Sequence, residues 1–156
     1  MKFKYLKPAL VLTALTAVIA LCSFCFTSPK EDYAAKDNAG ISFIEQDWSK
    51  ALADAKTQNK LVFLDIYATW CGPCKLLKKN TFSDPKVGEF FNSNFINVSV
   101  DGESGVGPTL AQQFNIEGYP SLIVADSTGK PVLFTYGYMG ADDLLAFAKE
   151  ALKRKK

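Results

Sequence analysis

The most informative absence in this 156-residue sequence is histidine, which does not occur at all. Without histidine the chain has no Cys–His or Ser–His pair for nucleophilic catalysis, no histidine-ligated zinc and no C-x-x-C-H haem attachment site. The chain also lacks a large excess of charge of one sign, since its formal net charge is only +2. That balance is too weak for the basic surface by which proteins bind nucleic acid, so a nucleic-acid partner is not expected.

The residues that are present describe a protein able to bury a core. The chain is 48% hydrophobic and contains 12 phenylalanines. Its length suits one ordinary domain with an appendage and is too short for two full domains. Four cysteines are the chemically reactive minority, and they form two C-x-x-C pairs, Cys22/Cys25 and Cys71/Cys74.

The N-terminus has the pattern of a targeting segment. Lys2, Lys4 and Lys7 precede an uncharged, mostly apolar run over residues 8–26. A basic start followed by such a run is typical of a secretory signal peptide, and this run is also about long enough to span a bilayer. We therefore expect residues 1–28 to be a signal peptide or an N-terminal membrane anchor, and in both cases the domain is exported.

A short polar linker, residues 29–40, separates this segment from a domain over residues 41–156. The linker is polar, small and aperiodic, as linkers are. All 16 acidic residues follow residue 28, whereas three lysines precede it. The exported part is therefore close to neutral, and the basic balance of the whole chain belongs to the targeting segment.

The pair Cys22/Cys25 has two interpretations. It is half of a four-cysteine zinc site completed by Cys71/Cys74, or it consists of small thiols tolerated in a hydrophobic segment. We favour the second, because a segment that is removed or held in a membrane does not fold against the domain. Cys71 and Cys74 are then the thiols of the mature domain, and no metal site or cofactor is expected.

Hydrophobic periodicity predicts alternating helices and strands in the domain. Asp47 and Asp84-Pro85 have the residues of helix starts, and the continuous apolar run 61–67 suits a central strand covered on both faces. Around the second strand, Ile96 and Val98 alternate with polar residues. The predicted elements are a helix from Trp48, strand 61–67, helix 71–79, a helix from Pro85, strand 95–100, a short helix near Leu110, strands 121–125 and 132–136, and helix 141–152. This order predicts an α/β fold in which a mixed central sheet is sandwiched by helices.

The reactive motif follows the first strand directly. Cys71 and Cys74 are separated by Gly72 and Pro73, which lets both thiols lie in one helical turn. At a helix N-terminus Cys71 is stabilised as a thiolate, and we expect it to be exposed while Cys74 is shielded one turn deeper. Gly72 is expected to permit the tight entry, and Pro73 fits the first turn because its missing N–H has no helical partner there. An attacking thiolate and a resolving thiol are what disulfide exchange needs.

Asp65 is the anomaly of the first strand, because it places a carboxylate within an apolar run. Burial of a carboxylate raises its pKa. Two interpretations are open: Asp65 faces a solvated gap at the strand end, or it accepts the proton of Cys74 when that thiol attacks a mixed disulfide.

The motif Trp70-Cys71-Gly72-Pro73-Cys74-Lys75 resembles the active site of the thioredoxin superfamily, and the similarity extends over residues 41–152. More locally, residues 63–71 and 81–85 resemble the C-terminal periplasmic domain of the DsbD family of disulfide reductases. The chain is also similar to small exported thioredoxin-like proteins of bacteria. The resemblance implies the thioredoxin fold, a redox-active Cys71–Cys74 disulfide and a periplasmic location.

The same resemblance implies roles for residues outside the motif. Thioredoxins have an aspartate at the spacing of Asp65, which supports the proton-acceptor interpretation. The proline that corresponds to Pro120 is cis in thioredoxins and faces the disulfide, so that the backbone of residue 119 pairs with an extended substrate. The candidate substrate-contact residues are Trp70, Gly72, Pro73, Tyr119 and Pro120; for Trp70 the other interpretation is a plain packing role.

Two features depart from the family pattern. Many thioredoxins have a lysine on the second strand near the buried aspartate, and Asn97 is expected at that place, so Asp65 is expected to lack this charge partner. The glycine-rich segment 101–107 is longer than a minimal thioredoxin needs, and we expect a flexible loop there.

The resulting hypothesis is an exported, monomeric thiol-disulfide oxidoreductase that reduces protein disulfides through Cys71 and Cys74, with Asp65 assisting proton transfer. Such a reductase needs an electron donor, and the resemblance points to a membrane reductase of the DsbD type. The alternatives are a disulfide oxidase or isomerase, and a non-catalytic membrane-tethered peptide-binding module.

Overall fold

The structure, a computed structural model, describes residues 40–155. The predicted signal or anchor, residues 29–39 of the predicted linker, and Cys22/Cys25 lie outside the described residues. Within residues 40–155, no helix has both the length and the apolar character needed to cross a membrane.

The elements follow the predicted order with one addition at the start. In chain order they are β1 (Ile44–Glu45), α2 (Trp48–Gln58), β2 (Leu61–Tyr67), α3 (Gly72–Leu76), the π-helix η2 (Leu77–Thr81), α4 (Pro85–Asn94), β3 (Phe95–Asp101), α5 (Gly107–Gln113), β4 (Ser121–Ala125), β5 (Pro131–Tyr136) and α6 (Ala141–Lys153). Sequence reasoning missed β1, which has only two residues and therefore no periodicity to detect.

The strands form one mixed sheet in the order β1-β3-β2-β4-β5. β2 runs parallel to β3, with Asp65 opposite Ser99, and antiparallel to β4, with Asp65 opposite Leu122. β4 and β5 form an antiparallel hairpin. The predicted α/β architecture, a mixed sheet sandwiched by helices, is confirmed. The central strand β2 is hydrogen-bonded along both of its edges, so the position of its carboxyl end is fixed.

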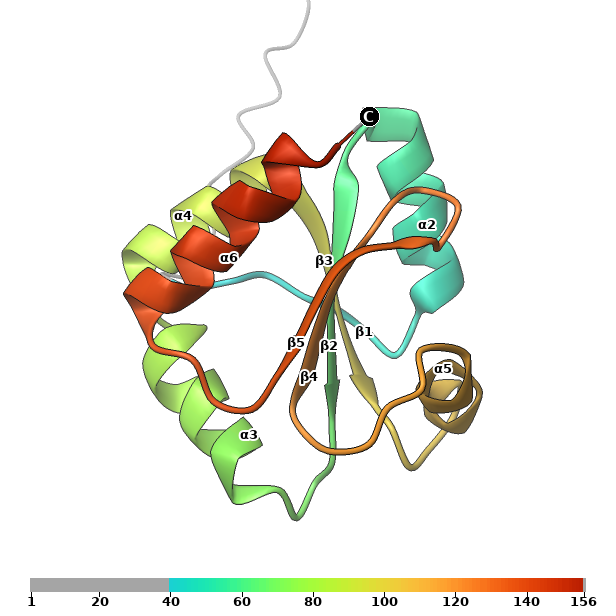
Figure 1. Ribbon diagram of the computed structural model, residues 1–156, viewed down its shortest axis with the longest axis vertical. Coiled ribbons are helices and arrows are strands. Elements are labelled where there is room, and N and C mark those ends of the chain that lie inside the picture. The colour runs from blue at the N-terminus through green and yellow to red at the C-terminus, as the bar shows by residue number, and fades with distance from the viewer. Residues whose placement is uncertain (1–39, 156) are drawn as a thin grey trace, which may run out of the picture. The chain divides into compact units, whose positions relative to one another are not determined.

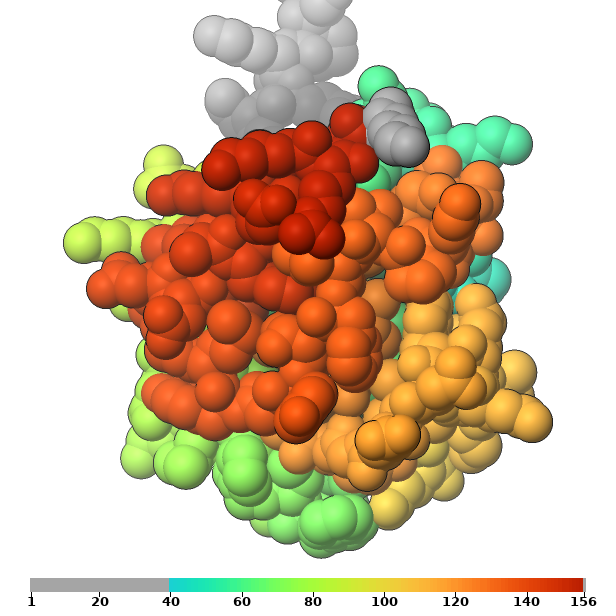
Figure 2. Space-filling view, in the orientation of Figure 1, coloured from blue at the N-terminus to red at the C-terminus, as the bar shows by residue number. Residues whose placement is uncertain are grey.

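Helices cover the two faces of the sheet (Figure 1). α4 and α6 pack on one face over a core that includes Phe63, Phe91 and Leu144, while α2 and α5 cover the other face over Val62, Leu64 and Val98. In the space-filling view, residues of α6 and of the β4–β5 hairpin form most of the visible face, and the segment that begins α3 lies at its lower end (Figure 2). The start of α3 thus lies at one end of the sandwich.

Helix starts were the most predictable local features. The carboxylate of Asp47 accepts a hydrogen bond from the backbone N–H of Lys50 and caps α2. Asp84 likewise accepts from Lys86 and Val87, with Pro85 in the first turn of α4. Such caps satisfy N–H groups that have no partner within the helix.

The helix predicted over residues 71–79 ends differently from the prediction. α3 ends at Leu76, and the chain continues as a π-helix to Thr81. The Thr81 hydroxyl donates to the carbonyl of Met139 at 2.7 Å, which ties this turn to the segment before α6. π-turns inside helices are often found beside functional sites.

Apolar and polar residues alternate along the sequence of β3, but buried and exposed residues do not alternate along the strand. Asn97 and Ser99 are both less than a tenth exposed, and so are the apolar residues that alternate with them, Ile96, Val98 and Val100. The reason is that β3 lies inside the sheet with both faces covered, where polar side chains need partners. The amide of Asn97 donates to Oδ1 of Asn92 at 3.1 Å, and Ser99 donates to Asp65.

Phe63 provides a test of the core. Its ring is fully buried and lies with its centroid 4.6 Å from that of Phe91 and 6.0 Å from that of Phe82. Phe63→Ala is expected to lower the free energy of unfolding by about 3–5 kcal/mol, because it removes a large apolar side chain and leaves a cavity. Denaturant unfolding of the oxidised protein measures this loss. The matched control is Phe134→Ala on β5, where the ring is 43% exposed and the expected loss is below about 1 kcal/mol. Equal losses would contradict the assignment of Phe63 to the core.

Candidate active site

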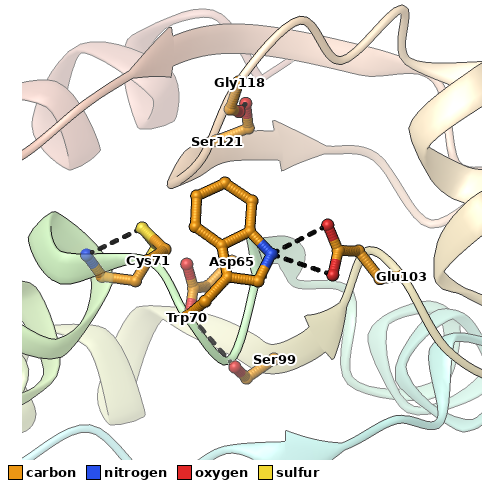
Figure 3. The surroundings of a disulfide bond; sticks show 8 residues. Asp65, Trp70, Cys71, Ser99, Glu103, Gly118 and Ser121 are labelled. Atoms are coloured by element: carbon orange, nitrogen blue, oxygen red, sulfur yellow. Dashed lines mark hydrogen bonds between the residues drawn. A yellow bond between two sulfur atoms is a disulfide. The ribbon is translucent and has the colours of Figure 1, made fainter.

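A disulfide joins Cys71 and Cys74 at the junction of β2 and α3, with the Cα atoms 5.3 Å apart. Cys71 is the N-cap of α3, and its sulfur accepts a hydrogen bond from the backbone N–H of Cys74 at 3.1 Å (Figure 3). The helix start thus places Cys71 at the N-cap and Cys74 within the first turn, as the spacing predicted. That the helix N-terminus stabilises the Cys71 thiolate in the reduced protein stays a prediction.

The expected difference in exposure is wrong for the disulfide form. Cys71 is only 2% exposed and Cys74 is 8% exposed, so both are buried. The cause is packing: the disulfide forms a cluster with Ala68, against which Tyr67 and Tyr119 pack. A partner disulfide therefore has to reach sulfur atoms that are surrounded by side chains.

The two residues between the cysteines differ in what the fold asks of them. Pro73 lies in the first turn of α3, as predicted. Gly72 is exposed, and a Cβ atom added to it would meet no atom within 4 Å. The tight entry expected to need a glycine therefore does not require one, and the glycine leaves the surface beside the disulfide open.

Asp65 is buried within β2, with only 6% of the residue exposed. Its Oδ2 accepts a hydrogen bond from the Ser99 hydroxyl at 3.0 Å (Figure 3), while its Oδ1 is buried without a hydrogen-bond partner. Burial raises the pKa of the Asp65 carboxyl to about 7; the Ser99 hydrogen bond opposes the rise, the charge of Glu45 adds to it and the charge of Lys78 also opposes it. The expected rise in pKa is present, and it places the carboxyl near neutrality.

Two cavities reach this carboxyl. One, of about 250 Å³, is lined by Asp65 together with Cys74, Lys78 and Ser99. The other, of about 530 Å³, is lined by Asp65, Glu45, Lys78 and Ser99 among others. Both are large enough for water. The two interpretations of Asp65 are thus compatible: the carboxyl is buried in the sheet, and it faces a hollow that it shares with Cys74.

The expectation that Asn97 stands beside Asp65 is wrong. The β2–β3 register places Asn97 opposite Phe63, and Ser99 is the residue opposite Asp65. A lysine is nevertheless near the carboxyl, because Lys78 of η2 lines both cavities. The positive charge comes from the helix after the motif, and the sequence pattern of the second strand had no means to show this.

The segment before β4 brings the second half of the predicted site to the disulfide. The Tyr119–Pro120 peptide bond is cis, as the resemblance implied. The carbonyl of Pro120 accepts from the N–H of Gly137 at 2.8 Å, and the Ser121 hydroxyl donates to the carbonyl of Gly118 at 2.8 Å. These contacts hold the turn in place, so that Tyr119 packs against the disulfide cluster.

Trp70 has a partner that sequence reasoning missed. Its indole N–H lies 3.0 Å from each carboxylate oxygen of Glu103 (Figure 3), and its ring lies edge-on to that of Tyr119 with centroids 6.0 Å apart. Glu103 belongs to the glycine-rich segment and is 33 residues from Trp70. No local pattern indicates a contact over that separation.

The structure thus brings together all the predicted site residues around one disulfide. Within residues 40–155 no group of three or more His, Cys, Asp or Glu side chains is arranged to hold a metal ion.

Replacement of Asp65 tests the buried carboxyl. Because its pKa is raised from 3.8 to about 7, the folded protein binds more protons than the unfolded chain between these values. The stability that this proton contributes is fully present below pH 3.8 and is lost as pH rises through 7. Asp65→Asn removes the loss and is expected to be more stable than wild type by up to about 4 kcal/mol at pH 8, with little difference at pH 4.

Denaturant unfolding at several pH values measures this difference. Glu89→Gln, at an exposed position of α4, is the matched control, and its free energy of unfolding is expected to vary with pH as that of wild type does. Parallel profiles for Asp65→Asn and wild type would show that the Asp65 carboxyl has an ordinary pKa.

Comparison with known proteins agrees with this geometry. A family model described as a thioredoxin-like domain matches residues 48–152. The chain is 31% identical over 149 residues to the thiol:disulfide interchange protein DsbD of Tatumella citrea, an alignment that covers 90% of this chain and 25% of that protein. For the DsbD protein of Yersinia pestis the identity is 36% over 94 residues, covering 58% and 16%. The chain spans about a quarter or less of the length of these relatives.

Solved structures show the same fold. A candidate disulphide-isomerase from Bacteroides thetaiotaomicron matches with a TM-score of 0.66 and 38% identity, covering 73% of this chain and 94% of that chain. The C-terminal domain of Neisseria meningitidis DsbD, in its oxidised form, matches with a TM-score of 0.57 and 24% identity, covering 66% and 90%, and shows the fold alone. The chain therefore belongs to the thioredoxin-like family of thiol-disulfide oxidoreductases, within the thioredoxin superfamily, and is DsbD-like.

Proposed function

We propose that this protein is an exported reductase of protein disulfides, located in the periplasm and either free or tethered by residues 1–28. The observation that supports the proposal most strongly is the shared cavity of Asp65 and Cys74 behind the Cys71–Cys74 disulfide. Through this cavity the Asp65 carboxylate is available as a proton acceptor for the resolving thiol, Cys74, in a chain that has no histidine.

The reaction has two exchange steps. In the reduced protein the Cys71 thiolate attacks one sulfur of a substrate disulfide, a mixed disulfide forms, and the other substrate sulfur leaves as a thiolate that takes up a proton. Cys74 then loses its proton and attacks the Cys71 sulfur, which releases the second substrate thiol and forms the Cys71–Cys74 disulfide. Two electrons pass from the protein to the substrate, and the disulfide seen in the structure is the oxidised product of the cycle.

Asp65 serves the second step. A carboxylate with a pKa of about 7 accepts a proton near neutral pH and releases it again without a large energetic cost. The cavity of about 250 Å³ allows a water molecule to relay the proton between Cys74 and Asp65. The Ser99 hydrogen bond orients the carboxyl through Oδ2 and leaves Oδ1 free to accept.

Each turnover as a reductase leaves the protein oxidised, so an electron donor must reduce Cys71–Cys74 again. The DsbD relatives are named as thiol:disulfide interchange proteins, and the similarity to part of them supports a membrane donor of the DsbD type. The segment before β4, which packs against the disulfide cluster through Tyr119, supports an extended polypeptide as substrate, paired with the backbone of Tyr119.

The reducing direction rests on the Gly72-Pro73 spacer, which resembles that of reducing thioredoxins. A second candidate function is disulfide isomerisation, favoured by the 38% identity to the Bacteroides thetaiotaomicron protein. A non-catalytic, membrane-tethered peptide-binding module is the alternative from another class.

Reduction of insulin by the purified full-length protein, with dithiothreitol as electron source, tests the activity. Wild type is expected to accelerate the reduction, and Cys71→Ser is expected to lose at least about a hundredfold of the rate, because the attacking thiolate is gone. Cys74→Ser that is reduced first and freed of dithiothreitol before insulin is added is expected to stop at a mixed disulfide with insulin through Cys71, which mass spectrometry detects.

The matched control is Ser93→Ala, which removes an exposed hydroxyl on α4 and is expected to keep the wild-type insulin rate. An unchanged rate in Cys71→Ser would exclude thiol chemistry and favour the peptide-binding module.

The reduction potential of Cys71–Cys74 separates the directions. A reductase is expected near the thioredoxin value of about −270 mV, whereas disulfide isomerases lie near about −180 mV and the oxidant DsbA near about −120 mV. Equilibration with dithiothreitol buffers of known potential, followed by thiol alkylation and mass spectrometry, gives the value. A potential above about −200 mV would favour isomerase or oxidase over reductase.

A further inference from the structure

The glycine-rich segment 101–107 forms a turn with several internal hydrogen bonds, which its composition did not indicate. The Asp101 carboxylate accepts from the backbone N–H of Glu103 at 3.0 Å and from the Ser104 hydroxyl at 3.1 Å. The N–H of Ser104 donates to the carbonyl of Asp101, and the N–H of Gly107 donates to the carbonyl of Ser104 at 2.8 Å. These bonds fix the position from which Glu103 projects.

Glu103 is the main anchor of an otherwise exposed ring. Trp70 is 67% exposed, and its indole N–H meets both carboxylate oxygens of Glu103. Besides this hydrogen bond, the ring has the edge contact with Tyr119. In Figure 3 the indole points its N–H toward Glu103 and lies between the disulfide and that loop. Without Glu103 the Trp70 side chain would have few contacts to hold it in one rotamer.

The same turn also supports the second aromatic residue. The N–H of Gly102 donates to the carbonyl of Tyr67 at 2.8 Å, which ties the turn to the end of β2. A Cβ atom at Gly102 would lie 2.6 Å from the Tyr119 ring, so the backbone of the turn is in close contact with that ring. Tyr119 in turn packs against the disulfide cluster. One turn therefore positions both aromatic side chains that flank Cys71–Cys74.

We propose that Glu103 is a positioning residue that fixes Trp70 against Tyr119, so that the two rings form a preformed apolar wall for an extended polypeptide substrate. The inference rests on the proposed disulfide exchange and adds a residue, Glu103, that shapes the surface for its polypeptide substrate. A wall that is already ordered spares the substrate the cost of immobilising a side chain on binding. The large exposed area of Trp70 supplies apolar contact that a polypeptide can cover.

The charges of the turn disfavour a small anionic disulfide such as oxidised glutathione. Among the described residues, neither Asp101 nor Glu103 forms a salt bridge. The Glu103 carboxylate lies beside the Trp70 ring, where it repels an approaching carboxylate. On the Trp70 side the turn thus combines an apolar surface with a negative charge, which suits a polypeptide segment that carries no excess of acidic residues there.

Steady-state kinetics of the full-length protein test the role of Glu103. With insulin as substrate, Glu103→Ala is expected to raise KM about three- to tenfold with little change in kcat, the cost of ordering one free side chain. Glu103→Gln keeps an oxygen that accepts from the indole, and it is expected to restore KM to within about twofold of wild type. With the small neutral substrate hydroxyethyl disulfide, the loss in kcat/KM for Glu103→Ala is expected to be smaller than with insulin. Glu89→Ala, which removes an exposed carboxylate on α4, is the matched control for net charge.

A spectroscopic measurement tests the positioning independently of turnover. The chain has two tryptophans, so Trp48→Phe leaves Trp70 as the single tryptophan, which is excited selectively at a wavelength where tyrosine does not absorb. Anisotropy decay is expected to show fast local motion of Trp70 in Glu103→Ala and little in the parent or in Glu103→Gln.

Unchanged anisotropy in Glu103→Ala overturns the positioning role. An unchanged insulin KM, an equal loss on both substrates, or failure of Glu103→Gln to restore KM overturns the role in substrate recognition. If the parent protein does not reduce insulin, the proposed function fails, and the anisotropy still decides whether Glu103 holds Trp70.

Discussion

The constraint on which the structure depends is the complete enclosure of β2. This strand pairs with β3 on one edge and with β4 on the other, and helices cover both of its faces. Its carboxyl end is consequently one of the most rigid points of the fold, and Cys71 follows it after three residues. The loops after β3 and before β4 meet at the same end, because β3 runs parallel to β2 and β4 runs against it. The active-site residues converge because these three strands are paired, although they are far apart in sequence.

The enclosure of β2 also explains why the Asp65 carboxyl costs stability and why its pKa lies near neutrality. A carboxyl in this strand has lost most of its water, and with one oxygen unpaired it is held only by Ser99. Within residues 40–155, Asp65 is the one acidic residue that is buried, and a cavity and Lys78 lie beside it. Such a local sacrifice of stability is typical of groups that must change protonation during a reaction. In a chain without histidine, a buried aspartate is one of the few ways to obtain a proton acceptor that works near neutrality.

Features set by local chemistry could be predicted from the sequence, and features set by distant contacts could not. Asp47 and Asp84 predicted the starts of their helices because a helix cap acts within three residues, and the apolar run of β2 predicted a strand covered on both faces. The cysteine pair and the cis Pro120 followed from a motif and a family resemblance. The edge strand β1 was too short to have a pattern, and the burial of Asn97 and Ser99 depends on neighbours in space. Lys78 beside Asp65, and Glu103 beside Trp70, are contacts between elements, so no spacing rule could reveal them.

The open space at Gly72 has a consequence for how such a protein diversifies. Since a Cβ atom there would meet no atom within 4 Å, the fold places no steric demand on the first atom of a side chain at this position. A lineage of such proteins can therefore exchange the residue after Cys71 without a clash at that atom, while the sheet, the buried carboxyl and the cis proline stay as they are.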